Sequence, residues 1–396
     1  MINPEALFAP DPNKPIAGLA PEPYKWLVID GGGMAVTAWA THRDLDTPED
    51  RVKSAIYIFV TVLASLSRLI EKDAKIIVAW DGYDNRAFRR GRHPWYKYGR
   101  GSVIDRNEVR VVIQQVSELL KCIGIGEVKI DKCEADDVVA TLCRIIDEDL
   151  EETVLIFSDD NDYRQLINDR IHLARRSMQG IIMSPEQCEL MNIDYGLDYL
   201  YIKALMGDPG DNIRGLKGIG EKKAQGIIDC IPDLMDTARM GDFDEIDWGQ
   251  RDRTTRNAVI RAGRRLLSPA PFAPKDEKAV NEYLLERGIE CHPTFKVDFH
   301  DEDCLEAAAR EALWCLELVE MELHMPCSIP EFPPINIDQI PRILRKLELD
   351  DEEDLFGSIY ALAGLSSDDI PDSYVAARRA AALRSESLAA PPGDMF

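Results

Sequence analysis

The first 200 residues alternate between two patterns of hydrophobic and polar positions. Short apolar runs predict buried strands at 26–30, 74–82, 127–130 and 152–162. Between these runs, apolar residues recur at helical spacing over 51–72, 109–125 and 133–147. Strands that alternate with helices predict an α/β fold, in which a parallel sheet carries helices on both faces.

After residue 200 the strand pattern stops, and the following segment is expected to form a second, mostly α-helical lobe. The first 23 residues contain six prolines, which predicts an extension without a core of its own. The C-terminal residues combine many acids with Ala, Ser and Pro, which is typical of a mainly disordered tail. The predicted parts are the extension 1–23, the α/β core 24–200, the helical lobe 201–345 and the acidic tail 346–396.

The charge of the chain is large and uneven. The net charge of −24 taken alone argues against a nucleic-acid-binding protein, which usually has a basic surface. Twelve acidic residues lie within 131–162, whereas 83–100 and 251–265 each hold six basic residues and one acid. This local separation of charge allows one surface to bind cations and others to bind phosphate groups.

Several protein classes are disfavoured by simple features of the chain. No run approaches the ~20 apolar residues of a membrane-spanning helix, and the N-terminus lacks the basic and apolar regions of a signal peptide. The nine cysteines include no C-x-x-C pair, so reduced thiols are expected. We therefore expect a cytoplasmic protein that is not associated with a membrane.

Carboxylates follow the predicted strands and begin two of the later segments. Because the carboxyl ends of parallel strands meet at one edge of a sheet, these side chains are expected to converge there. Any one of them alone is equally well explained as a helix cap or turn residue. The set has nine members: Asp30, Asp81, Glu134, Asp136, Asp137, Asp160, Asp162, Asp208 and Asp211.

Nine carboxylates in one cleft would repel one another strongly unless cations were bound. Mg²⁺ prefers oxygen ligands and leaves positions for water and phosphate, and no histidine lies at ligand spacing that would favour zinc. Two such ions can activate water and stabilise the leaving oxygen of a phosphodiester. Asp159 lies in the same cluster as Asp160 and Asp162, and the sequence leaves open which two of the three would bind metal.

Two other motif interpretations are weaker. The stretch GGGMAV follows a strand, as in dinucleotide-binding proteins, but Val36 stands where that motif has its third Gly or Ala. The stretch VIDGGG is similar to an aspartyl-phosphate phosphatase motif, but Gly32 stands where a second aspartate would be needed.

Six motifs in order give the chain a family resemblance: VIDGGG, AWDG, AFRRGRHPWYKYGR, CEADDVVA, FSDDNDYRQL and KALMGDPGDNIRGLKGIGEKKA. With these motifs the chain resembles the FEN-like 5′-nuclease family, which includes bacteriophage flap endonucleases and the 5′-nuclease domains of bacterial DNA polymerase I. The resemblance covers residues 24–270, with a weaker match to about 345. It implies a PIN-like α/β core and two-metal cleavage of branched DNA with a free 5′ end. It also implies that the protein acts in the cytoplasm of a bacterium or a phage-infected host.

The resemblance also implies roles for individual residues. One Mg²⁺ ion would be held by Asp30, Asp81, Glu134, Asp136 and Asp137, and the second by Asp160, Asp162, Asp208 and Asp211; Mn²⁺ is expected to substitute. Whether Asp211 binds metal directly or through water stays open. A helical arch at about 83–108 would bring Phe88, Arg89, Tyr96, Lys97 and Arg100 to the DNA. In the arch, Lys97 and Arg89 would offset charge on the scissile phosphate, and Tyr96 would stack on a terminal base.

The helical lobe would contain a helix–hairpin–helix element within 201–270. The hairpin backbone can approach a phosphate because glycine has no Cβ, and the resemblance implies a K⁺ ion at its carbonyls. An arginine-rich helix would extend this contact along the duplex without reading sequence. The residues concerned are Gly218, Ile219, Gly220, Lys222, Lys223, Arg253, Arg256 and Arg264.

The function predicted from the sequence is thus a 5′-3′ exonuclease and flap endonuclease acting on 5′-flap, nicked or 5′-ended duplex DNA in replication or repair. Two alternatives remain: a DNA-junction-binding protein of the same fold without catalysis, and a PIN-type ribonuclease. The acidic tail, with DDEEDLFGSI and PPGDMF, is a candidate binding segment for a replication protein, although a solvating tail explains it as well.

Overall fold

The computed structural model describes residues 24–94, 96–98, 104–176, 182–230, 234–241, 246, 253–267, 300–347, 357, 359–360 and 362–365. The N-terminal extension, Arg100 of the arch and most of the acidic tail therefore lie outside the described residues.

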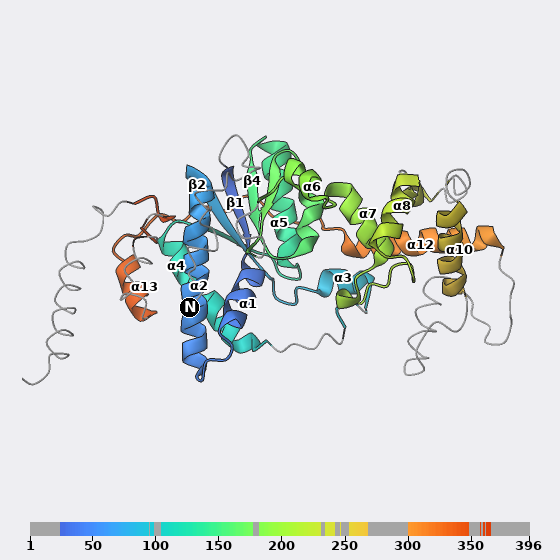
Figure 1. The fold of residues 1–396 in the computed structure, drawn as a ribbon. Helices are drawn as coiled ribbons and strands as arrows, with labels where there is room; N and C mark the ends of the chain where they lie inside the picture. Colours follow the sequence, from blue (N-terminus) through green and yellow to red (C-terminus); the bar gives the residue numbers. More distant parts are fainter. Residues whose placement is uncertain are drawn as a thin grey trace, which may run out of the picture.

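A six-stranded sheet in the order β3-β2-β1-β4-β5-β6 forms the centre of the first half (Figure 1). Its strands are β1 (Tyr24–Asp30), β2 (Ile70–Trp80), β3 (Gly126–Lys129), β4 (Val154–Phe157), β5 (Ile171–Ala174) and β6 (Ile182–Met183). All neighbours pair in parallel except β5 and β6, which are antiparallel. The predicted parallel α/β core is confirmed, and the sequence analysis missed β5 and β6.

Helices cover both faces of the sheet. On one face lie α1 (Gly31–Thr41), α2 (Pro48–Leu66) and α4 (Arg106–Cys122), and on the other lies α5 (Ala135–Arg144). In β1, Leu27 and Ile29 pack toward α2, whereas Trp26 and Val28 pack toward α5. Because both faces are buried, the central strands are apolar without interruption, as parallel strands usually are.

The second lobe is helical and lies at one end of the molecule (Figure 1). It contains α7 (Gly196–Met206), α8 (Glu221–Cys230), α9 (Leu234–Met240), α10 (Arg253–Leu267) and α12 (Asp301–Val319), which share one hydrophobic cluster. Two short helices complete this part of the chain, α3 (Ala87–Arg92) within the arch segment and α6 (Pro185–Met191) after β6. Within the described residues, no named strand follows residue 200.

The chain returns from the helical lobe to the core after residue 319. Residues 321–332 pack along the α5 side of the sheet, and α13 (Ile340–Lys346) packs against α4 at the opposite end of the molecule (Figure 1). Ile359 and Tyr360 are fully buried in the same cluster as α2. The prediction of a mainly disordered tail is therefore wrong for these residues, because two large apolar side chains anchor them.

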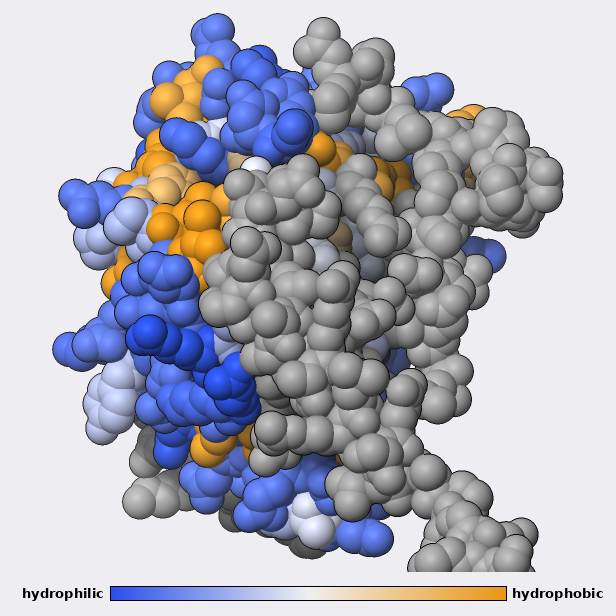
Figure 2. All heavy atoms as spheres, turned by 90° about the vertical axis from the view of Figure 1, so that its left-hand side faces the viewer, coloured by the Kyte–Doolittle hydropathy of each residue, from blue (hydrophilic) through white to orange (hydrophobic). Residues whose placement is uncertain are grey.

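The described residues contain neither a membrane-spanning helix nor a disulfide bond. Seen from the end that carries α13, the described surface is mainly hydrophilic, with a limited hydrophobic area (Figure 2). No helix among the described residues combines the length and apolar character that a bilayer span requires. The eight described cysteines are all free.

Candidate metal centre and phosphate-binding surfaces

The topology of the sheet brings three aspartates together at its carboxyl edge. β1 lies between β2 and β4, so Asp30 at its end is flanked by Asp81 after β2 and by Asp160 after β4. Each accepts a hydrogen bond from an amide at the start of a helical segment. Asp30 Oδ1 accepts from the Gly33 amide at 2.8 Å and Asp160 Oδ1 from the Asp162 amide at 3.0 Å, in the segments that follow them, whereas Asp81 Oδ1 accepts from the Ala135 amide at the start of α5 at 3.0 Å. Capping therefore fixes the three carboxylates near one another.

Asp30 is the most strongly perturbed carboxylate of this edge. Burial raises its pKa to about 7, and the charges of Asp81, Asp136 and Asp160 add to the effect, although the Gly33 amide opposes it. Ser158 connects Asp30 with Asp160, because its Oγ donates to Asp30 Oδ2 at 3.1 Å and accepts from the Asp160 amide at 3.2 Å. Among the described residues, Asp30, Asp81 and Asp160 form no ion pair with a basic side chain.

A first flanking group of carboxylates lies at the start of α5. Arg89 is buried and binds Asp137 with both ends of its guanidinium, at 2.6 and 2.8 Å, and Glu134 at 2.8 Å. Lys97 Nζ lies 2.8 Å from Glu134 Oε1 and 3.5 Å from Asp211 Oδ2. Burial nevertheless raises the pKa of Asp137, to about 7, with the charge of Asp136 next in importance.

A second flanking group lies between η4 (Asn161–Leu166) and η6 (Pro209–Asp211). Lys203 of α7 forms ion pairs with Asp162 and, at 3.1 Å, with Asp208. Burial raises the pKa of Asp162 to about 6, with Asp160 adding to the shift. Burial would also raise the pKa of Asp208, but Lys203 and two backbone amides reverse the direction and lower it. Asp211 belongs to both groups, since Lys97 joins it to Glu134.

The structure thus brings all nine predicted carboxylates to one rim, from separate elements. In the described part of the chain, no three or more His, Cys, Asp or Glu side chains form a ready metal-binding set. The outer carboxylates instead face Arg89, Lys97 and Lys203. The donors nevertheless fit Mg²⁺, because they are carboxylate oxygens and because the central carboxylate, Asp30, is half-buried among other acids without a basic partner in the described residues.

The arch residues lie close to the carboxylates, but two aromatic side chains that were predicted to contact DNA are buried or partly buried. Tyr96 is buried in the hydrophobic cluster of the helical lobe, with Arg89 and Lys97 over its ring at 5.6 and 4.9 Å. The predicted stacking of Tyr96 on a base is therefore wrong for this conformation, because no ring face is open. Phe88 packs partly buried against the α5 side of the core. Among the described residues of this region, the exposed aromatic side chains are Tyr83 and Tyr98.

The hairpin between α7 and α8 has the geometry expected of a glycine turn. Gly218 has a φ of +92°, which other residues rarely adopt, and Lys222 and Lys223 are exposed at the start of α8. Gly220 has open space at its Cβ position. Ile219, however, is buried in the helical lobe, so its side chain anchors the hairpin and offers DNA only backbone atoms.

The same hairpin does not fit the predicted K⁺ ion. Arg265 Nη1 donates to the Lys217 carbonyl at 2.8 Å, and Lys223 Nζ donates to the Gly218 carbonyl at 2.8 Å. Two carbonyl groups of the turn therefore already face positive charges, which would repel a further cation. Arg265 itself was absent from the predicted site residues.

The three predicted arginines of α10 divide into two kinds. Arg253 is exposed, whereas Arg256 and Arg264 each lie 3.5 Å from an oxygen of Asp301 in α12. These two pairs are at least partly exposed, so they weaken phosphate binding only slightly.

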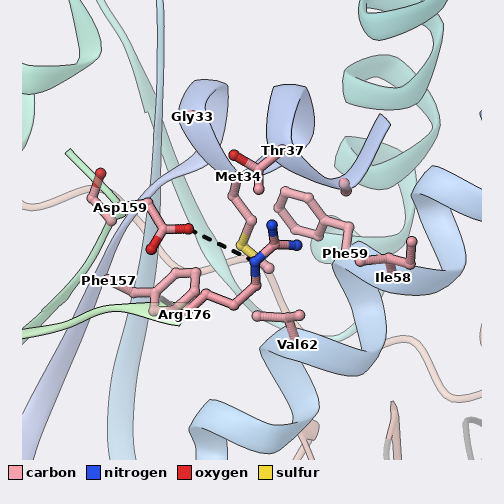
Figure 3. Close-up of a pocket in the computed structure, with 11 residues that line it drawn as sticks. Gly33, Met34, Thr37, Ile58, Phe59, Val62, Phe157, Asp159 and Arg176 are labelled. Atoms are coloured by element: carbon pink, nitrogen blue, oxygen red, sulfur yellow. Dashed lines mark ion pairs between the residues drawn. The ribbon is translucent and has the colours of Figure 1, made fainter. Parts of the chain in front are cut away.

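Asp159 points away from the carboxylate rim. Its Oδ2 lies 3.8 Å from Arg176 Nε, above a small hollow lined by α1 and α2 (Figure 3). Met34, Phe59 and Val62 supply apolar walls to this hollow. Of the three neighbouring aspartates, the structure therefore leaves Asp160 and Asp162 at the rim.

Sequence reasoning missed three polar residues of the centre: Ser158, Lys203 and Gln165. Ser158 and Gln165 stand in FSDDNDYRQL and Lys203 in KALMGDPGD, so all three lay within motifs already singled out. The sequence could have indicated them by residue type and spacing, because each has a hydrogen-bond-donating side chain and lies one to five residues from an aspartate of the same motif.

The chain matches the family model described as "5′-3′ exonuclease, N-terminal resolvase-like domain" over residues 25–191. It is 30% identical over 198 residues to a 5′-3′ exonuclease of Buchnera aphidicola (subspecies Schizaphis graminum), covering 50% of this chain and 67% of that protein. It is also 30% identical over 205 residues to thermostable DNA polymerase I of Thermus thermophilus, covering 51% of this chain. The chain spans only 23% of the length of that polymerase.

Among solved structures, the T5 D15 protein co-crystallised with metal ions superimposes with a TM-score of 0.48 and 20% identity. The superposition covers 85% of this chain and 99% of the T5 protein. The catalytic core of Rad2 in complex with DNA substrate gives a TM-score of 0.45 at 14% identity, covering 85% of this chain and 93% of that catalytic-core chain.

Proposed function

Since the chain belongs to the 5′-3′ exonuclease family, we propose that it is a Mg²⁺-dependent 5′-nuclease that cuts DNA at 5′ flaps and 5′ ends. The observation that carries the proposal is the convergence of nine carboxylates at the carboxyl edge of one parallel sheet, with half-buried Asp30 at their centre. A protein that only bound DNA would gain nothing from acids held against a phosphate backbone.

In this proposal Asp30, Asp81 and Asp160 would bind the metal ions at the carboxyl edge of the sheet. The two flanking groups would supply the remaining carboxylate ligands. When bound, two Mg²⁺ ions would supply an activated water and charge stabilisation for the leaving oxygen. Mn²⁺, with similar oxygen ligands, would substitute.

Arg89 and Lys97 would provide the cationic side of the site. Their partners Glu134, Asp137 and Asp211 are themselves proposed metal ligands. Metal binding would therefore weaken these ion pairs and leave the side chains of Arg89 and Lys97 available to a phosphate. The buried bidentate pair of Arg89 with Asp137 is the harder to break, and Lys97, with longer and fewer contacts, is the better candidate to reach the substrate.

DNA would be gripped at a second point by the hairpin and α10. The open Gly220 and the exposed Lys222 and Lys223 would contact phosphates without reading bases, and the exposed Arg253 of α10 would add positive charge. The loop from Asp208 to Gly220 is continuous, so the distance from the metal centre to this grip would be set by about a dozen residues.

The proposal is tested by incubating the protein with a 5′-flap duplex in Mg²⁺ or in EDTA. We expect cutting only in Mg²⁺, and no cutting by the double variant Asp160→Ala with Asp162→Ala. The matched control is Asp159→Ala, which alters the neighbouring aspartate that points away from the rim and should still cut. Binding without cutting in Mg²⁺ would favour a junction-binding protein, and cutting of RNA flaps alone would favour a ribonuclease.

A further inference from the structure

Gln165 joins the second carboxylate group to the end of the helical lobe. Its Nε2 donates to the Asp162 carbonyl at 2.9 Å and to the Val319 carbonyl at 3.2 Å, and its Oε1 accepts from the Met321 amide at 2.8 Å. Val319 is the last residue of α12, and both Val319 and Met321 are buried. One side chain thus fixes the backbone of η4 against the backbone that leaves the lobe.

The residues that follow reach the first carboxylate group. The Glu322 amide donates to Asp137 Oδ1 at 2.9 Å, and Arg89 Nη2 donates weakly to the Glu320 carbonyl at 3.4 Å. Thr141 of α5 holds the same stretch, because its Oγ1 donates to the Glu322 carbonyl at 3.1 Å and accepts from the Met325 amide at 3.1 Å. We name residues 319–325 the crossing segment.

The crossing segment therefore touches both flanking groups and continues directly from α12. The two groups stand on separate elements, α5 and η4, and their like charges would push these elements apart. Backbone-directed hydrogen bonds to the crossing segment oppose this repulsion, in addition to the ion pairs that Lys97 and Lys203 form with the two groups. The segment lies beyond residues 25–191, which match the family model.

We propose that Gln165 is a positioning residue that, with the crossing segment, holds the two carboxylate groups at the spacing needed for metal binding and couples that spacing to the helical lobe. The inference rests on the proposed function, since it concerns the ligands of the same metal centre. Partners that orient metal ligands typically contribute ten- to a hundredfold to metal affinity.

The test is a Mn²⁺ titration of the full chain without DNA, followed by electron paramagnetic resonance, with flap-cutting kinetics in parallel. We expect Gln165→Ala to weaken Mn²⁺ binding roughly tenfold and to lower kcat with little change in KM for the flap. Gln187→Ala, a buried glutamine of α6 away from the rim, is the control and should titrate like the wild type.

A second variant protects the test against misfolding. Thr141→Val keeps the volume of the side chain but removes both hydrogen bonds to the crossing segment, so it should weaken Mn²⁺ binding in the same direction. If the wild type binds Mn²⁺ and cuts while Gln165→Ala and Thr141→Val titrate unchanged, the inference is overturned and the proposed function stands. If the wild type neither binds Mn²⁺ nor cuts, both fail.

Discussion

The centre of the carboxylate rim and its flanks are balanced in different ways. On the flanks, basic side chains form ion pairs with the carboxylates: Arg89 and Lys97 with Glu134 and Asp137, and Lys203 with Asp162 and Asp208. In the centre, Asp30, Asp81 and Asp160 have only backbone amides and Ser158 among the described residues. The protein thus supplies its own cations around the edge and leaves the middle without them.

This difference shows where an external cation has the most to contribute. A buried carboxylate without a cation holds its proton to a higher pH, as the raised pKa of Asp30 shows. A bound divalent ion would remove that penalty at the centre, whereas on the flanks it would have to compete with lysine or arginine. The predictions that follow address this contrast, beginning with the largest expected effect.

Loss of Lys203, the cation of the second flanking group, should destabilise the metal-free protein. Lys203→Met leaves Asp162 and Asp208 without their cation in a mostly buried site, and breaking a buried pair in this way costs about 3–5 kcal/mol. Urea unfolding in EDTA measures the loss, and Mg²⁺ should recover part of it. The exposed Lys217→Met is the control, and equal stability of the two variants would contradict the account.

Removal of the charge of Asp30 from the centre should stabilise the metal-free protein, in contrast to the loss of Lys203. In Asp30→Asn the amide oxygen can still accept from the Gly33 amide, while the buried charge disappears. A pKa raised to about 7 means that the charged form of Asp30 costs the folded state roughly 2–4 kcal/mol at pH 8. The free energy of unfolding of the metal-free variant should therefore exceed that of the wild type by up to this amount. A variant less stable than the wild type in EDTA would show that Asp30 is not under strain.

The stability of the metal-free wild type should fall as the pH rises. Asp30, Asp137 and Asp162 have pKa values raised to about 7, 7 and 6, so the folded state binds more protons than the unfolded state between pH 4 and 7. Stability therefore declines through this window and levels off above it. Thermal melts in EDTA from pH 5 to 8 measure the decline, and the stabilisation by Mg²⁺ should grow as the pH rises. A rising melting temperature would refute this assignment.

The smallest effect is expected at the surface end of the crossing segment. Arg239 of α9 pairs with Glu320 at 2.6 Å, but both side chains are more than a third exposed. Arg239→Ala should therefore change stability by less than about 1 kcal/mol and leave Mn²⁺ affinity unchanged. A loss of Mn²⁺ affinity here would mean that the crossing segment is coupled to the centre through its surface contacts as well.

The sequence predicts the centre of the site better than its surroundings. Asp30, Asp81 and Asp160 follow apolar strands, and parallel pairing alone then brings their side chains to one edge. The partners Lys203 and Gln165 lie near carboxylates in the sequence, but only their contacts in the folded protein distinguish them from the other polar residues of the same motifs. Tyr96 and Ile219 were assigned to DNA, yet packing of the helical lobe buries both.

The fold outside the sheet centre shows the same limit. The strands β5 and β6 are short, and their apolar residues are too few to stand out from the neighbouring loops. Ile359 and Tyr360 lie in a strongly acidic region, so composition alone suggested disorder, whereas their burial against the core decides the structure.

The central claim is that the carboxylates without basic partners hold the catalytic metal. The most direct measurement is single-turnover cutting of a 5′-flap duplex in Mg²⁺ by the wild type and by Asp30→Asn, with both proteins folded and bound to DNA. We predict that Asp30→Asn cuts at least about a hundredfold more slowly, because one charged ligand at the centre is lost. Equal rates, or cutting by the wild type in EDTA, would contradict the account.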